Sequence, residues 1–117
     1  DLCPLHGITN AGVLDWKLRK SGCLEAARKF QREGRCKHIG FTTHATTDII
    51  VRAIETSEFD YVNLHWYFVN DFNWPAVEAA AAKDMGVFII SSIMVIAFNL
   101  ITDAVYSLVD PRIEAHA

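Results

Sequence analysis

Residues 59–68 constrain the fold of this chain more than any other stretch of its sequence. The stretch reads FDYVNLHWYF, is rich in aromatic and β-branched residues and contains neither glycine nor proline, which is typical of a buried strand. Because side chains alternate along a strand, Asn63 and His65 share a face with Tyr61, and Val62 and Leu64 point the other way. A strand that is polar on one face near its carboxyl end, with helical patterns before and after it, predicts an α/β site.

Strand and helix patterns alternate through most of the chain. We expect strands at residues 1–7, 37–43, 59–66 and 87–90, and helices at 12–34, 46–55 and 73–85, with the first helix broken at Ser21-Gly22. Pro4 cannot donate to a β ladder, so the first strand is expected at a sheet edge. The last strand is apolar throughout, which predicts that both of its faces are covered.

Repeated βα units with short connections predict a parallel sheet, either an open doubly wound sheet or part of a (β/α)8 barrel. No GxGxxG loop follows any expected strand, which counts against a Rossmann unit. Polar residues recur at the carboxyl ends of the strands, which converge on the active-site face of a barrel. They are His6, Thr42, Thr43, His44, Asn63, His65, Ser91 and Ser92. The predicted fold class is therefore α/β, with parallel βα repeats forming a partial (β/α)8 TIM barrel over residues 1–91.

Residues 92–117 follow a different pattern, because their apolar residues have no clear amphipathic period. Asn99, Thr102 and Asp103 interrupt the apolar run, so we expect a divergent tail with a buried apolar C-terminal helix and no membrane span. A helix this apolar needs a partner surface, either the rest of a barrel or a second copy of the chain.

Charge and cysteine content weigh against several classes of function. The formal net charge is -3, with acidic and basic residues interspersed, so neither nucleic acid nor an anionic membrane is an expected partner. The three cysteines form no CxxC pair, which favours reduced thiols and a cytoplasmic location. No basic and apolar leader precedes the first strand, and we therefore expect the chain to be an internal fragment of a longer protein.

Four runs in the sequence carry a family resemblance. They are residues 1–7 (DLCPLHG), 34–45 (GRCKHIGFTTHA), 59–67 (FDYVNLHWY) and 85–91 (MGVFIIS). In this order they resemble consecutive segments of an aldo/keto reductase, in the branch whose full-length members carry a C-terminal iron–sulfur domain. The resemblance implies an oxidoreductase with a (β/α)8 barrel that binds NADP or NAD and transfers a hydride to the carbonyl carbon of an aldehyde or ketone.

The resemblance also implies site residues. Members use a tetrad of aspartate, tyrosine, lysine and histidine, and only the histidine has a match, His6, which would orient the substrate carbonyl as a catalytic residue. Thr42, Thr43 and Asn63 match positions that hold the nicotinamide carboxamide, and Ser91 is a further expected cofactor contact. An apolar run replaces the glycine-containing phosphate loop after Ser91. Because the tetrad aspartate, tyrosine and lysine have no match, we expect this chain alone to be inactive.

Two alternatives stay open. In the first, His6, His44 and His65 at three strand ends converge on a metal ion in a barrel hydrolase, although no HxH pair or matching carboxylate supports this. In the second, a non-catalytic half-barrel forms a homo-oligomer through its open strand edges and its apolar C-terminal helix. The expected partner is thus a small-molecule carbonyl substrate in the parent enzyme, or a second copy of the chain.

Overall fold

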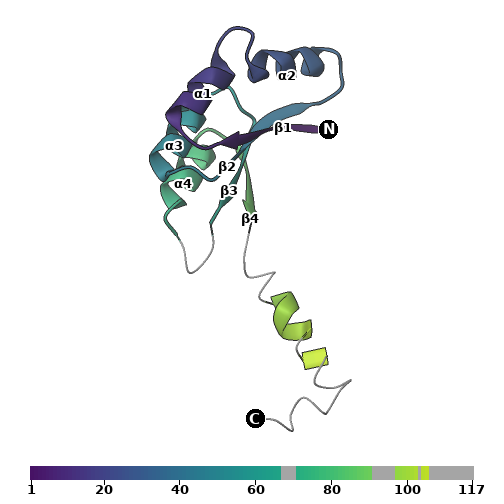
Figure 1. Cartoon of the computed structure of the whole chain (residues 1–117), viewed down its shortest axis with the longest axis vertical. Helices are drawn as coiled ribbons and strands as arrows, with labels where there is room; N and C mark the ends of the chain where they lie inside the picture. The colour runs from purple at the N-terminus through teal and green to yellow at the C-terminus, as the bar shows by residue number, and fades with distance from the viewer. Residues whose placement is uncertain (67–70, 91–96, 103, 106–117) are drawn as a thin grey trace.

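The computed structural model describes residues 1–66, 71–90, 97–102, 104 and 105. Within them, four parallel strands form one sheet in the order β1-β2-β3-β4 and alternate with helices (Figure 1). In chain order the elements are β1 (Leu2–Ile8), α1 (Ala11–Leu18), α2 (Cys23–Arg32), β2 (His38–Thr43), α3 (Thr47–Glu55), β3 (Tyr61–His65), α4 (Trp74–Ala82) and β4 (Gly86–Ile90). The α/β class, the parallel sheet and the position of β1 at a sheet edge are as predicted.

Two helix boundaries have clear local causes. The predicted break between α1 and α2 is confirmed, since Ser21 has a φ of 62° and a Cβ on Gly22 would lie 2.5 Å from the carbonyl oxygen of Lys17. Only glycine allows that approach. The predicted end of α4 at Met85 is wrong, because the helix ends at Ala82 and Asp84 takes a left-handed φ of 54° before β4 begins.

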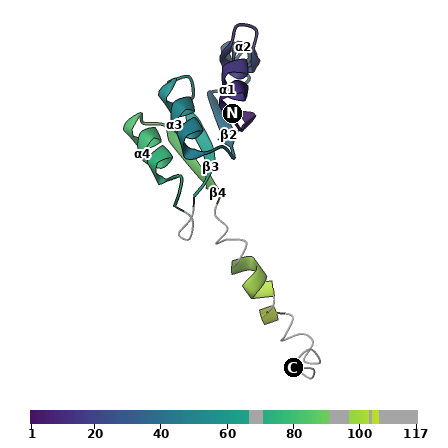
Figure 2. The same ribbon diagram turned by 60° about the vertical axis from the view of Figure 1, so that its left-hand side comes forward.

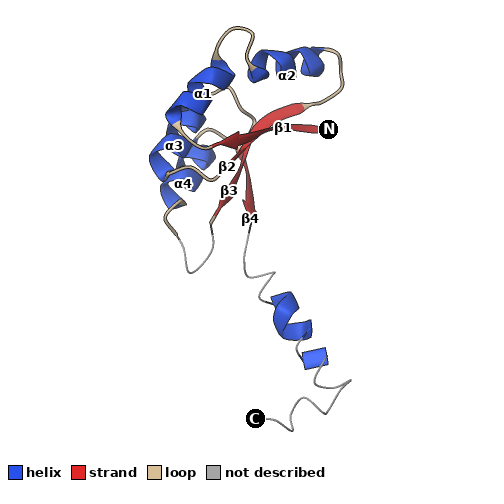
Figure 3. Cartoon of the chain, in the orientation of Figure 1, coloured by secondary structure: helices blue, strands red, loops and turns tan. Residues whose placement is uncertain are grey.

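The helices lie on one face of the sheet. Figures 1 and 2 show α1, α3 and α4 side by side on that face, and the colouring of Figure 3 separates them from the strands. The helix α2 joins the same buried core through Leu24 and Ala27. The core combines strand residues of one pleat face with one stripe from each helix; its fully buried members include Ile8, Leu14, Ile39, Phe41, Ile50, Ala53, Ile54, Val62 and Leu64. The predicted orientation of Val62 and Leu64 is confirmed.

The opposite face of the sheet, which we call the open face, is not covered by a helix in the described residues. Leu2 and Phe88 are each 49% exposed there. Tyr61 is the exception, at 6% exposed, because its ring lies across Gly40 of the neighbouring strand. A Cβ on Gly40 would lie 2.5 Å from that ring, and Gly86 flanks Tyr61 on its other side. Glycines on both sides thus form a slot for the tyrosine.

The apolar C-terminal part of the chain is less covered than the sequence suggested. Phe88 at 49% and Ile89 at 42% exposed contradict the expectation that both faces of β4 are covered, because β4 is an edge strand beside the open face. In the predicted tail the described residues 97–102 are helical, and Phe98, Leu100 and Ile101 are exposed. Their predicted burial is therefore not found. No helix in the described ranges is both long and apolar enough to cross a membrane.

Candidate functional site

The carboxyl end of β1 contains a bulge that positions His6. The register runs evenly as far as Leu5 opposite Phe41, but the next pair is Ile8 opposite Thr43, so β1 has one residue more than β2 in this interval. Gly7 takes a left-handed φ of 72°, which glycine adopts readily. Bulges re-aim side chains and are frequent beside active sites. Here the bulge leaves the His6 side chain exposed at the strand end.

Three side chains hold this bulge in place. The backbone N–H of Gly7 donates to Thr42 Oγ1 at 3.0 Å, and the same oxygen lies 3.1 Å from His6 Nδ1. Thr43 Oγ1 donates to the carbonyl oxygen of Ile8 at 2.7 Å. Lys17 Nζ donates to the carbonyl oxygen of His6 at 2.8 Å. The backbone groups that the bulge removes from the regular ladder thus have side-chain partners, so these side chains stabilise the irregular strand end.

Thr43 is a structural residue in this arrangement. Its side chain is 2% exposed, and Oγ1 also accepts from the N–H of Ala45 at 3.0 Å. The hydroxyl is therefore used within the fold, although the sequence pointed to Thr43 as a cofactor contact. We leave Thr43 out of the proposed cofactor site for this reason.

A groove of about 340 Å³ lies on the open face below the strand ends. Its lining residues come from all four strands and are Leu2, Pro4, Thr42, Tyr61, Asn63 and Phe88. Thr42 and Asn63 are register partners on β2 and β3, so the two predicted site residues lie side by side. The rings of Tyr61 and Phe88 meet edge to face with centroids 5.4 Å apart. The groove therefore has aromatic walls and a polar end.

Two buried polar atoms of this groove, Tyr61 Oη and Asn63 Oδ1, have no hydrogen-bond partner among the described residues. An unpaired buried polar group costs about 1 to 3 kcal/mol. A ligand bound in the groove would give these two atoms hydrogen-bond partners. Burial, and after it the nearby Cys3 and Cys36 thiols and Asp60, raise the pKa of Tyr61 above its usual range. The phenol therefore stays protonated at neutral pH.

The histidines at the other strand ends pair with each other. The ring centroids of His44 and His65 lie 4.6 Å apart, and the ring planes are tilted by 33°. Asn73 Nδ2 donates to the carbonyl oxygen of His65 at 2.7 Å and thereby ties the end of β3 to the start of α4. The described residues contain no group of three His, Cys, Asp or Glu side chains that could hold a metal ion. The metal-hydrolase alternative therefore has no structural support.

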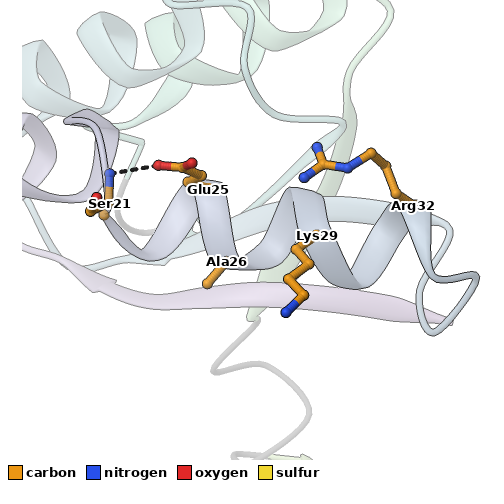
Figure 4. Close-up of a pocket in the computed structure, with 6 residues that line it drawn as sticks. Ser21, Glu25, Ala26, Lys29 and Arg32 are labelled. Atoms are coloured by element: carbon orange, nitrogen blue, oxygen red, sulfur yellow. Dashed lines mark hydrogen bonds between the residues drawn. The ribbon is translucent and has the colours of Figure 1, made fainter.

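A second groove, of about 260 Å³, lies along α2 and is drawn in Figure 4. The backbone N–H of Ser21 donates to Glu25 Oε2 at 2.6 Å, so this carboxylate holds the turn that precedes the helix. Lys29 and Arg32 extend in different directions in Figure 4 and do not converge on a common point. We therefore read this groove as a charged helix surface without a binding role.

The sequence did not single out Lys17, although it holds the carbonyl of His6. Lys17 is only 8% exposed. The available signal was a lysine three residues after Leu14, the buried position of α1. A lysine on the buried face of a helix needs a partner, and this one finds it at the strand end.

Of the predicted site residues, the structure brings His6, Thr42 and Asn63 together on neighbouring strands, whereas Ser91 lies outside the described residues. Comparisons of this chain with protein-family models, with curated proteins and with solved structures found no match.

Proposed function

We propose that this chain forms part of the (β/α)8 barrel of an aldo/keto reductase-like oxidoreductase, which transfers a hydride between NADP or NAD and the carbonyl carbon of an aldehyde or ketone. The observation that carries the proposal is the contact of 3.1 Å between His6 Nδ1 and Thr42 Oγ1 at the carboxyl ends of adjacent parallel strands. In barrel enzymes the reacting groups gather at this end of the strands.

The arrangement of the layers supports a barrel over a doubly wound sheet. A doubly wound sheet carries helices on both faces and reverses its strand order at a switch point. In the described residues the strand order follows the sequence, and the helices share one buried core on one side. Continued in the same sense, such a sheet closes on itself with its open face inside.

Within this proposal each site residue has a separate role. His6 binds and orients the carbonyl oxygen of the substrate, and Asn63 offers its amide to the nicotinamide carboxamide in the groove. Ser91 stays a predicted cofactor contact from the family resemblance alone. The dinucleotide supplies the hydride when bound, and the proton donor would come from a tyrosine that has no match in this sequence.

The test is a titration of ¹⁵N-labelled chain with NADPH and, separately, NADH, followed by NMR. We expect weak, saturable shifts centred on Thr42, Asn63 and Phe88, with a dissociation constant on the order of 1 mM because the phosphate contacts are missing. Asn63→Leu, which keeps the side-chain size but removes the amide, should abolish the shifts, whereas the exposed control Glu78→Gln should not. The site assignment fails if neither dinucleotide shifts these residues, or if the shifts centre on α2.

Carbonyl reduction is a separate arm of the test. The chain alone should not oxidise NADPH in the presence of an aldehyde or ketone, because the sequence holds no match for the family's proton donor. Saturable oxidation of NADPH by the purified chain would contradict this part of the proposal.

A half-barrel that associates with a second copy is the other candidate, and the exposure of Leu2 and Phe88 on the open face favours it. Sedimentation equilibrium distinguishes a monomer from a dimer. A dimer that Phe88→Lys dissociates would support self-association, and a chain that stays monomeric at high concentration would remove it.

A further inference from the structure

We propose that Thr42 is a positioning residue that fixes the tautomer of His6, so that the neutral imidazole carries its proton on Nε2 and offers it to a bound acceptor. The inference deepens the proposed function and rests on it for the identity of the acceptor, a substrate carbonyl oxygen. The tautomer itself follows from hydrogen bonds at the strand end.

The first step concerns the hydroxyl of Thr42, which has one proton to donate. Its oxygen already accepts the N–H of Gly7 at 3.0 Å and lies 3.1 Å from His6 Nδ1. If Thr42 donates to Nδ1, the Gly7 N–H proton and the hydroxyl proton each have an acceptor. Successive hydrogen bonds in one direction also polarise and strengthen one another.

The reverse arrangement satisfies fewer groups. If Nδ1 carried the proton, Thr42 Oγ1 would accept from both Gly7 and the ring, and its own proton would find no acceptor among the described residues. The backbone N–H of Gly7 has only one direction of donation. This donation is the same in both arrangements, and the hydroxyl proton decides between them, because only an unprotonated Nδ1 gives that proton an acceptor.

The second step concerns what holds this series in place. The register shift between Leu5 and Ile8 frees the Gly7 N–H from the ladder for Thr42. Lys17 Nζ holds the same peptide unit from its other side, through the carbonyl oxygen of His6 at 2.8 Å. The peptide that follows His6 is thus held at both its N–H and its C=O, and His6 Nε2 has no hydrogen-bond partner in the described part of the chain.

A fixed Nε2–H selects the chemistry of the ligand. A donor at this position binds a carbonyl oxygen or an oxyanion and rejects a group that can only donate. The inference also changes the role of Thr42. Its hydroxyl was expected to contact nicotinamide, and its hydrogen bonds assign it to the histidine instead.

The experiment reads the tautomer directly from the ¹⁵N shifts of the His6 ring, by long-range ¹H–¹⁵N NMR at about pH 8.5, where an ordinary imidazole is neutral. His6→Gln assigns the signals. We expect the Nε2–H form to dominate in the natural chain, and its ratio to the Nδ1–H form to fall roughly fivefold in Thr42→Val, the effect of losing one ordinary hydrogen bond. Thr42→Ser should restore the ratio, and the distant control Thr56→Val should leave it unchanged.

A predominant Nδ1–H form in the natural chain overturns the proposal, and so does an unchanged ratio in a folded Thr42→Val. If Thr42→Val does not fold, the natural chain and Thr42→Ser decide the question, because both must show the Nε2–H form. The outcome is independent of cofactor binding. If the ring is in the Nε2–H form and neither NADPH nor NADH shifts the site residues, the proposed function is removed and this inference stands. If a dinucleotide shifts them and the ring is in the Nδ1–H form, the proposed function stands and this inference is removed.

Discussion

The two faces of the sheet are built from alternate residues of the same strands, yet they obey different rules. On the helix-covered face, Ile39, Phe41 and Val62 are each 0% exposed and belong to one core. On the open face, Leu2 and Phe88 are 49% exposed, and Tyr61 is buried because Gly40 leaves room for its ring. Large side chains fill the helix-covered face, whereas glycines, which have no side chain, shape the open face. Removing side-chain volume should therefore lower stability on the helix-covered face, and adding volume at the glycines should lower stability on the open face.

The sharpest test of this comparison is a matched pair of phenylalanines. Phe41→Ala should lower the free energy of unfolding by about 3 to 5 kcal/mol, because it removes a fully buried ring from the core and leaves a cavity. Phe88→Ala, on the open face, should cost about 1 kcal/mol, mostly from its contact with Tyr61. Urea unfolding followed by circular dichroism measures both. Equal costs would mean that the open face is packed as tightly as the core.

The glycine slot gives the next largest effect, from added volume. Gly40→Ala should cost about 2 to 3 kcal/mol, since its methyl would lie 2.5 Å from the Tyr61 ring. Gly86→Ala, with its nearest contact at 3.2 Å, should cost less. In a double-mutant cycle, Tyr61→Ala should remove most of the cost of Gly40→Ala. Additive costs would place the strain somewhere other than in the slot.

The two threonines at the end of β2 test the comparison at a single step of the strand. Thr43→Val should cost about 1 to 2 kcal/mol, because the carbonyl of Ile8 and the N–H of Ala45 lose their buried partner. Thr42→Val, half-buried on the open face, should cost less and act mainly on His6. The midpoints of urea unfolding, compared at constant m-value, rank the two variants. If Thr42→Val were the more destabilising, Thr42 would have the structural role and Thr43 the positioning role.

Tyr61 should give the smallest effect and an unusual sign. Tyr61→Phe removes a buried hydroxyl that has no partner among the described residues, so stability should stay unchanged or rise by about 1 kcal/mol. A loss of stability would reveal a hydrogen bond to that hydroxyl.

The same variant also tests a pH dependence. Burial raises the pKa of Tyr61 in the folded chain above the value of 10.0 expected for the unfolded chain. A raised folded pKa means that the folded state keeps its proton longer, so stability is fully present below about pH 10 and declines as the pH rises further. Tyr61→Phe should lack this part of the decline in alkaline urea titrations. Parallel curves for the two proteins would show that the phenol is not buried.

Periodicity predicted those parts of the fold that depend on which side of an element is apolar. Ile50, Ala53 and Ile54 recur at helical spacing in α3 and are all buried, and such a 3.6-residue period is a local property that the sequence shows. The orientation of β3 was predictable for the same reason, from its two-residue period. These are also the features that place Asn63 on the open face.

The bulge that positions His6 could not be read from the sequence. It depends on hydrogen bonds between Thr43 and Ile8 and between Thr42 and Gly7, groups 35 residues apart along the chain. Neither the β propensity of residues nor their hydrophobic period predicts the register between two strands that are far apart in the sequence. A glycine after a histidine was visible, but its left-handed conformation is a consequence of that register.

Proline at position 4 has a consequence for how this sheet can grow. A strand added beside β1 would find no amide hydrogen at Pro4, so that edge templates further pairing poorly. The β4 edge contains no proline between Gly86 and Ile90, and it presents exposed Phe88 and Ile89. Sheet extension is therefore directional. An added strand, whether from this chain or from another molecule, is favoured at β4, and a single proline there would close the sheet to pairing from both sides.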